Sequence, residues 1–275
     1  VQFLNEHAKE HGVNISNMEV DVPTMQKRKD KVVQILTGGV ASLLKKNRID
    51  VFNGTACFVS PSQIRIQNSM DNSSKDLQGT SIIIASGSKP VEISVAKIDN
   101  EYIVNSTGAL NFQEVPKRLG IIGAGALGLE IGSVWSRLGA EVVILEALPD
   151  FLAMADQSIT REALKILTKQ GLDIHLNSLV SNVSVSNKKA LIEYTSNSNE
   201  KSLEVNKVIV AVGRVANTDG LNLRAVNIKT DQKGFIVVNK NWQTSLKSVY
   251  AIGDVIGGAM LAHKGSDEGI ALAEQ

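Results

Sequence analysis

The chain has 275 residues, 43% of them apolar, which is long enough for one large or two medium globular domains. Its 29 lysine and arginine residues nearly balance 28 aspartate and glutamate residues, and the formal net charge of +1 gives no reason to expect nucleic acid or an anionic membrane surface as a partner. No apolar run approaches the roughly eighteen residues of a membrane span.

The N-terminal sequence VQFLNEHAKEHG lacks the pattern of a secretory signal peptide, and the first residue is Val1 rather than methionine. We therefore expect a fragment of a longer protein that is not secreted. Cys57 is the single cysteine, which excludes a disulfide within the chain and fits a reducing compartment. Its setting in GTACFV predicts a buried and unreactive strand residue.

The first seventeen residues have a helical pattern that ends at Gly12. His7 and His11 are four residues apart, a spacing at which two histidines can bind one metal ion. No third ligand lies nearby, so a solvated helix face is the favoured interpretation and no metal site is expected.

Residues 24–46 predict a long amphipathic helix, because apolar side chains recur at spacings of three and four between basic flanks. Gly38 and Gly39 lie in its middle and each lowers helix stability by about 1 kcal/mol relative to alanine. Close approach of another backbone or a ligand would explain this cost.

The next segments have strand patterns at 50–58, 63–67 and 81–85, and the polar stretch MDNSSKDLQG before the last predicts a hairpin or loop. The run SIIIA at 81–85 has no polar alternation, which is typical of a strand buried on both faces. It ends in SGSKP, a turn of small residues where a ligand can approach the backbone. Residues 93–116 read as a connection, with Ser106 or Thr107 as the cap of a short helix.

The segment from 119 to 146 carries the strongest motif. An apolar strand at 119–122 runs into the glycine turn GAGALG, a helical pattern follows at 127–137, and a second strand at 142–145 stops at Glu146. This order of elements is typical of a dinucleotide site, and the alternative is a tight strand-to-helix turn that binds nothing.

Each conspicuous residue of this segment has a physical role in such a site. Gly123 permits the tight turn, Gly125 has no side chain to keep a pyrophosphate from the backbone, and Gly128 lets the helix pack closely on the sheet. The helix N-terminus presents free N–H groups to the phosphates. Glu146 can accept hydrogen bonds from a ribose diol and repels a 2′-phosphate, so the acid favours NAD(H) over NADP(H).

The remainder of the chain alternates between strand and helix patterns. They predict a turn at 148–152, a helix at 156–170, strands at 174–176, 179–185, 190–194 and 205–212, a hairpin turn at SNSNEK, further strands at 234–238 and 249–252, and a helix at 267–274. Residues 107–214 are thus accounted for by one dinucleotide-binding domain with an appended small sheet.

Taken in order, these segments resemble the flavin- and NAD-dependent pyridine nucleotide–disulfide oxidoreductases over essentially the whole chain. The resemblance is carried by KDKVVQILTGGVASLLKKN, IIIASGSKP, IGAGALGLEIGSVWSRLGAEVVILE, ITREALKILTKQGL, AVGRVANTDGL and YAIGDVIGGAMLAHKGSDEG. It implies an α/β fold of Rossmann-like FAD- and NAD(P)-binding domains, with the NAD domain inserted in a truncated FAD domain. The implied parts are 1–102 and 234–275 for FAD and 103–233 for NAD.

The resemblance also implies which residues bind the cofactors NAD and FAD. For NAD it implies the glycine turn, the start of the following helix, the acid, a residue near the adenine and one near the nicotinamide: Gly123, Ala124, Gly125, Ala126, Leu127, Gly128, Leu129, Glu130, Glu146, Val180 and Gly213. For FAD it implies Ala56 at the adenine, Ser86, Gly87 and Ser88 at the diphosphate, Asp254 at the sugar-like chain, and Met260, Leu261, Ala262 and His263 along the flavin edge.

Some of these positions have a simpler interpretation or depart from the family pattern. Glu130 reads equally as an ordinary acid in a first helical turn, and Asp254 as a loop residue. Ala56 stands where the family usually has glycine, and Ser86 where it usually has threonine. The sequence GGA at 257–259 replaces a more typical Arg-Gly-Pro, which puts a charge contact in that loop in doubt.

The resemblance implies the reoxidation of dihydrolipoamide on a lipoyl domain by NAD+, within a 2-oxoacid dehydrogenase complex, by a homodimer. It also implies a bacterial cytoplasmic or mitochondrial matrix location. The family's CxxxxC redox pair, first glycine turn and His–Glu base are not in this sequence, so no catalytic residue is assigned and the fragment alone is expected to be inactive. Two alternatives stay open: a glutathione- or mercuric-reductase-like enzyme, and a nucleotide-binding module without activity.

Overall fold

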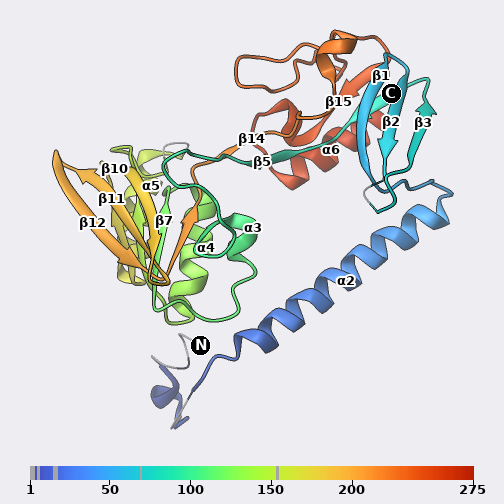
Figure 1. The fold of residues 1–275 in the computed structure, drawn as a ribbon. Helices are drawn as coiled ribbons and strands as arrows, with labels where there is room; N and C mark the ends of the chain where they lie inside the picture. The colour runs from blue at the N-terminus through green and yellow to red at the C-terminus, as the bar shows by residue number, and fades with distance from the viewer. Residues whose placement is uncertain (1–3, 5–6, 15–17, 69, 153–154) are drawn as a thin grey trace. The chain divides into compact units, whose positions relative to one another are not determined.

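The computed structural model divides the chain into two compact units. Unit 1 comprises Val1–Thr37 and Pro90–Gly213, and unit 2 comprises Gly38–Lys89 and Arg214–Gln275 (Figure 1). The predicted assignment of the chain to FAD and NAD domains stays a prediction. The structure describes residues 4, 7–14, 18–68, 70–152 and 155–275.

Unit 1 is built on a five-stranded parallel sheet with the strand order β6-β13-β7-β8-β9. The central strands are apolar and almost entirely buried, so both faces of the sheet need a cover. The α/β fold predicted from the sequence is confirmed. The strands are β6 (Ile103–Asn105), β7 (Arg118–Ile122), β8 (Glu141–Leu145), β9 (Leu172–His175) and β13 (Lys207–Val210).

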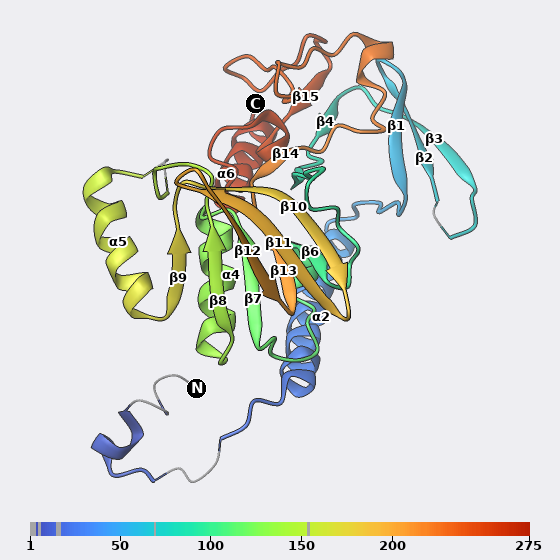
Figure 2. The same ribbon diagram turned by 60° about the vertical axis from the view of Figure 1, so that its left-hand side comes forward.

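Helices cover one face of this sheet. Alternate residues of β7, among them Ile121, point to this side and pack with Leu129 and Trp135 of α4 in one core cluster. Figure 2 shows α4 lying along β7 and β8, with α5 beside β9. The helices are α3 (Ser106–Ala109), α4 (Ala126–Arg137) and α5 (Gln157–Lys169).

A three-stranded antiparallel sheet covers the other face (Figure 2). Here Ile122 packs with Ile192 and Val205 in a second core cluster. A Cβ placed on Gly120 would lie 2.6 Å from Cδ1 of Ile192, so the end of the Ile192 side chain occupies the space beside this glycine. The strands are β10 (Ser178–Ser186), β11 (Lys189–Ser196) and β12 (Asn199–Val205).

Unit 2 combines a small antiparallel sheet with two short two-stranded pairings around its own core, to which Phe58, Ile84 and Val249 belong. The antiparallel sheet is β1 (Thr55–Ser60), β2 (Gln63–Gln67) and β3 (Ser74–Gln78). β4 (Ile82–Ile84) pairs in parallel with β15 (Val249–Ala251), and β5 (Ser88–Pro90) pairs with β14 (Arg214–Ala216). The helical segments are η2 (Leu223–Val226), η3 (Gly253–Ile256) and α6 (Ala262–Ala273).

The long helix α2 (Val22–Lys46) confirms the helix predicted for 24–46, and the boundary between the units falls inside it. Asp21 begins it by accepting hydrogen bonds from the backbone and side chain of Thr24. A Cβ placed on Gly38 or Gly39 meets no described atom within 4 Å. That a close approach explains these two glycines stays a prediction.

The stretch MDNSSKDLQG, expected to be a hairpin or a loop, forms part of a hairpin: it contains β3, which pairs with β2 and is joined to it by an ion pair between Arg65 and Asp76 at 2.7 Å. Two other predicted segments differ from the structure. The strand expected at 205–212 is divided between β12 and β13. No strand forms at 234–238, where Ile236 makes only an isolated bridge to Thr230.

The ends of two helices also differ. The cap of α3 is Asn105 rather than Ser106 or Thr107, because its Oδ1 accepts from the amides two and three residues later at 3.0 and 3.1 Å. Helix α6 begins at Ala262 rather than 267, since glycine and serine in its first turns weaken the helical pattern.

At the N-terminus the helical pattern that is predicted to end at Gly12 falls partly outside the described residues. The described part contains the 3₁₀ helix η1 (Ala8–His11), and Nδ1 of His7 lies 3.4 Å from a carboxylate oxygen of Glu10. Among the described residues, no three His, Cys, Asp or Glu side chains gather into a possible metal site. None of the described helices is long and apolar enough to cross a membrane.

We predict that Gly39→Ala stabilises the protein, because the new methyl group meets no described atom and the helix gains about 1 kcal/mol of propensity. Urea denaturation followed by circular dichroism should show a higher midpoint with an unchanged slope. A lower midpoint would mean that the alanine methyl group does meet a neighbour.

Candidate functional site

The glycine turn of unit 1 follows β7 and is shaped by close backbone contacts. Gly123 has a φ of 106°, and its amide donates to the carbonyl of Leu145 at 2.8 Å. A Cβ on Gly123 would lie 2.6 Å from the carbonyl oxygen of Ala211. A Cβ on Gly128 would lie 2.2 Å from the carbonyl oxygen of Gly123. Any larger residue at Gly123 or Gly128 would therefore collide with the backbone of the turn.

Gly125 occupies a different environment from the other two glycines. It is the N-cap of α4, it is exposed, and a Cβ placed on it meets no described atom within 4 Å. No described side chain caps this helix end, so the first amides of α4 have no side-chain acceptor within the described part of the chain. The end of the helix therefore offers N–H donors and a positive dipole end to an anionic group such as a pyrophosphate.

Glu146 lies at the end of β8, beside the turn. Its Oε2 accepts a hydrogen bond from the amide of Ala124 at 2.8 Å, and its Oε1 accepts one from the amide of Leu148 at 2.9 Å. The side chain is half-buried. The acid and the glycine turn, 22 residues apart in sequence, are thus brought into direct contact.

The other residues expected to bind the nucleotide differ in how exposed they are around this turn. Ala126 and Glu130 are exposed on the first turns of α4, while Leu129 is buried in the core beneath. Gly213 is exposed two residues after Ala211, whose carbonyl contacts the turn. Val180 is 7% exposed within the cluster between the two sheets, so its side chain belongs to the core.

In unit 2 the expected flavin residues follow two neighbouring parallel strands. β4 leads into Ser86, Gly87 and Ser88, and β15 leads into Asp254. Because the carboxyl ends of parallel strands meet at one edge, residues from both segments lie together there. This is the edge at which α/β sheets bind ligands.

The contact between these segments is a chain of three side chains. The hydroxyl of Ser88 donates to Oδ2 of Asp254 at 2.5 Å and accepts from Nε of Arg214 at 2.6 Å. Arg214 donates a second hydrogen bond, from a terminal nitrogen, to the carbonyl of Ser88 at 2.6 Å. All three are half-buried, which strengthens these charge-assisted bonds. Asp254 is therefore held in a fixed orientation.

Asn217 holds the first part of the small-residue turn. Its amide group donates to the carbonyl of Ser86 at 3.1 Å, and its backbone N–H donates to the carbonyl of Gly87 at 2.9 Å. The hydroxyl of Ser86 donates back to the carbonyl of Asn217 at 2.7 Å. Gly87 has a φ of 74° and no described atom near its Cβ position, so the turn leaves room at this point.

Glu268 of α6 supports the segment that carries Asp254. One of its oxygens accepts from the amide of Gly253 at 2.7 Å, and the other lies 2.7 Å from Nζ of Lys264. Burial raises the pKa of Glu268, but hydrogen bonds from Lys264, Gly253 and Trp242 outweigh it and the pKa lies below its ordinary value.

The remaining expected flavin residues lie at the start of α6 and in β1. Met260 has a φ of 47°, which is uncommon for a residue other than glycine, and Leu261 is the N-cap of α6. Ala262 and His263, in the first turn of α6, are exposed. Ala56 is half-buried in β1, where it pairs with Ile66.

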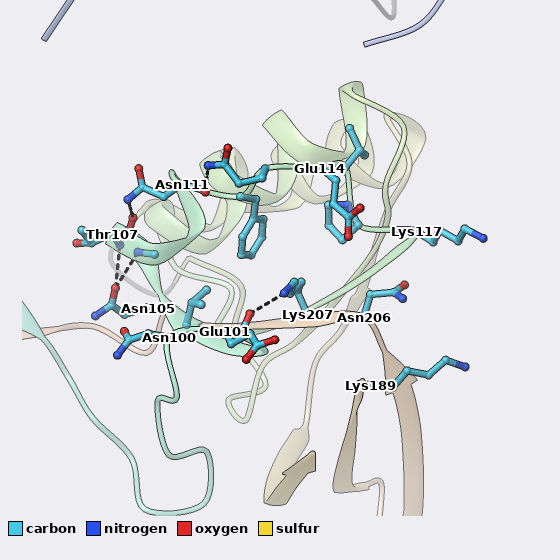
Figure 3. Close-up of a pocket in the computed structure, with 16 residues that line it drawn as sticks. Asn100, Glu101, Asn105, Thr107, Asn111, Glu114, Lys117, Lys189, Asn206 and Lys207 are labelled. Atoms are coloured by element: carbon cyan, nitrogen blue, oxygen red, sulfur yellow. Dashed lines mark hydrogen bonds between the residues drawn. The ribbon is translucent and has the colours of Figure 1, made fainter. Parts of the chain in front are cut away.

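A cavity of about 1080 Å³ lies elsewhere in unit 1 (Figure 3). It is lined by residues of β6 and α3 and of the segments that precede β6, β7 and β13, together with Lys189 at the start of β11. Lys117 and Lys189 extend away from it, and Lys207 donates to the carbonyl of Glu101 at 2.8 Å. None of the residues expected to bind a cofactor lines it, and we assign it no ligand.

A comparison with protein-family models matches residues 2–269 to the model described as pyridine nucleotide-disulphide oxidoreductase. The chain belongs to this family. The predicted resemblance is therefore confirmed, and both candidate regions lie inside the matched span.

Two relatives and one solved structure place the chain more closely within the pyridine nucleotide-disulphide oxidoreductases. It is 44% identical to a dihydrolipoyl dehydrogenase of Cupriavidus necator over 99% of this chain and 57% of the relative, and 41% identical to a mitochondrial dihydrolipoyl dehydrogenase of Pisum sativum over 96% and 53%. A Cu(II) complex of the HOCl-induced flavoprotein disulfide reductase RclA from Escherichia coli has a TM-score of 0.85 at 29% identity, over 99% of this chain and 59% of that chain. The chain thus spans little more than half the length of the proteins it matches.

Three side chains of the unit 2 region were not expected from the sequence: Arg214, Asn217 and Glu268. They lie within the family motifs AVGRVANTDGL and HKGSDEG, yet nothing in their local patterns indicates a partner. Arg214 and Asn217 contact residues more than 120 positions away in the sequence. The periodicity of a sequence predicts only local structure, so it does not indicate such contacts.

We predict that two alanine substitutions in the glycine turn differ in their effect on the free energy of unfolding. Gly128→Ala should destabilise the protein by about 1–3 kcal/mol, because its methyl group collides with the backbone at Gly123. Gly125→Ala should lower the free energy of unfolding by only about 0.5–1 kcal/mol, because the methyl group enters open space and only the weaker N-cap preference of alanine counts against it. Urea denaturation of both variants measures the difference, and equal losses would contradict this geometry.

We predict that acidification weakens the support given by Glu268. A carboxylate whose pKa is lowered in the folded state contributes stability above its ordinary pKa of 4.5, and this is lost as the pH falls through the lowered value. The stability difference between the native protein and Glu268→Gln should therefore shrink below pH 4.5. Thermal unfolding across a pH series tests this, with Glu162→Gln on α5 as the control; a constant difference would contradict it.

Proposed function

We propose that the chain is the pyridine nucleotide-binding part and a portion of the flavin-binding part of a dihydrolipoyl dehydrogenase. The intact enzyme would reoxidise dihydrolipoamide on a lipoyl domain with NAD+, as a homodimer within a 2-oxoacid dehydrogenase complex of the bacterial cytoplasm or mitochondrial matrix. The identity to dihydrolipoyl dehydrogenases from a bacterium and a plant supports this choice over other disulfide reductases.

The observation that carries the nucleotide assignment is the open space at Gly125 beside an oriented acid. A dinucleotide placed here would set its pyrophosphate against the first amides of α4 and its ribose diol against Glu146. A carboxylate at the ribose opposes a 2′-phosphate, so we assign NAD(H) rather than NADP(H).

The residues of unit 2 fit a second cofactor, FAD. Ser86, Gly87 and Ser88 form a turn with room at the backbone, and Asp254 is an oriented acceptor for hydroxyl groups. FAD, when bound, would accept two electrons from a dithiol, which is thereby oxidised to a disulfide, and would pass them to NAD+ as hydride. The chain's own contribution is to bind and orient the two cofactors.

We predict that the protein binds NAD+ and that NADP+ binds at least about tenfold more weakly, since a 2′-phosphate beside Glu146 meets like charge. Isothermal titration calorimetry of the purified chain measures both. Gly125→Ala should weaken NAD+ at least about tenfold while the protein stays folded, because its methyl group fills the position of the pyrophosphate.

The control for this experiment is Gly39→Ala, an equal change of side chain in α2 that should leave NAD+ affinity unaltered. Equal affinity for the two nucleotides, or full affinity in Gly125→Ala, would refute the assignment of this turn.

A further inference from the structure

Four hydrogen bonds within the polypeptide fix the position of Glu146. Its two carboxylate oxygens accept from the amides of Ala124 at 2.8 Å and Leu148 at 2.9 Å. Its own amide donates to the carbonyl of His175, and its own carbonyl accepts from the amide of Ser178, at 2.9 and 2.8 Å. The position of the side chain is therefore fixed by contacts within the protein, without a bound nucleotide.

The carboxylate retains capacity for a ligand in this arrangement. A carboxylate has about four acceptor positions, two on each oxygen, and each backbone donor uses one. One position per oxygen is left, which matches the two O–H donors of a vicinal diol. The backbone bonds and the ribose bonds do not have to compete.

The bond to Ala124 also bears on the shape of the turn. Ala124 lies between Gly123, with its φ of 106°, and Gly125, the N-cap of α4. Fixing the N–H of Ala124 fixes the peptide plane between Gly123 and Ala124, one residue before Gly125, where the backbone must face the pyrophosphate.

We propose that Glu146 is a positioning residue for the glycine turn at the same time as it accepts the ribose hydroxyls. One carboxylate then sets both the path of the turn and the choice of nucleotide. This rests on the proposed nucleotide site, although the contacts that carry it lie within the polypeptide.

The substitution Glu146→Gln separates this role from simple ribose binding. A glutamine amide offers one acceptor oxygen and one NH₂ donor, so one of the two backbone amides would face a donor. The turn should then loosen in the ligand-free protein. A side chain that served only the ribose would leave the ligand-free turn unchanged.

The first measurement is amide hydrogen exchange of Ala124 and Leu148 by NMR in the ligand-free chain. In Glu146→Gln at least one of the two amides should exchange at least about tenfold faster, the factor expected for loss of a hydrogen bond to a charged group. The control Glu162→Gln, an exposed acid on α5, should leave both rates unchanged. Glu146→Asp keeps the charge but is one methylene shorter, so it should also speed at least one exchange.

The second measurement compares NAD+ with an analogue that lacks the 2′-hydroxyl of the adenosine ribose. The native chain should prefer NAD+ by at least about tenfold, and the preference should fall to about twofold or less in Glu146→Gln. A purely structural role for Glu146 would lower both affinities equally and keep the preference, which would overturn the proposal.

The outcomes also distinguish this proposal from the proposed function. Unchanged exchange in both Glu146 variants, with the preference for NAD+ lost, would overturn the positioning role and leave the nucleotide site standing. If the Glu146 variants exchange faster but the native chain binds no NAD+, the proposed function is refuted. The proposal that Glu146 both positions the turn and binds the ribose is then refuted as well. If Glu146→Gln does not fold, the exchange rates of Glu146→Asp decide, and unchanged rates there overturn the proposal.

Discussion

The parallel pairing of β7 with β8 is the constraint on which the arrangement of the glycine turn and Glu146 depends. Their register sets Ile122 opposite Leu145, so the residues that follow, Gly123 and Glu146, leave the sheet side by side. A shift of one residue would turn the alternating side chains to the wrong faces and part the acid from the turn. The hydrogen bond from Ala124 to Glu146 is the local result of this register.

The same constraint acts in unit 2 on a smaller scale. Ile84 of β4 lies opposite Ala251 of β15, and the segments beyond them carry Ser88 and Asp254, which meet at 2.5 Å. In both units the strands are apolar and serve to position the segments that follow them, while the polar groups lie just past the carboxyl ends of the strands. The polar residues of the two candidate sites are thereby separate from the buried residues that stabilise the fold.

Most of what could be predicted from the sequence is local. The strand–turn–helix–strand order around Gly125 follows from apolar runs and glycines within thirty residues, and the structure has each of these elements. The strand β3 was missed because only Leu77 of its five residues is even partly buried, and periodicity detects strands through a core face. Arg214 was missed because its partner Ser88 is 126 residues away.

Helix α2 bears on how this protein can be divided into parts. Val22 is 2% exposed in the core of unit 1, and the buried side chain of Gln26 donates to the carbonyl of Phe112 at 2.8 Å. Expression of residues 90–213 alone would uncover an apolar surface and leave that carbonyl without its donor, at about 1–3 kcal/mol for the polar group alone. A self-sufficient version of unit 1 therefore has to be assembled from two separate stretches of sequence, and a linker joining the first half of α2 to Pro90 is the natural design.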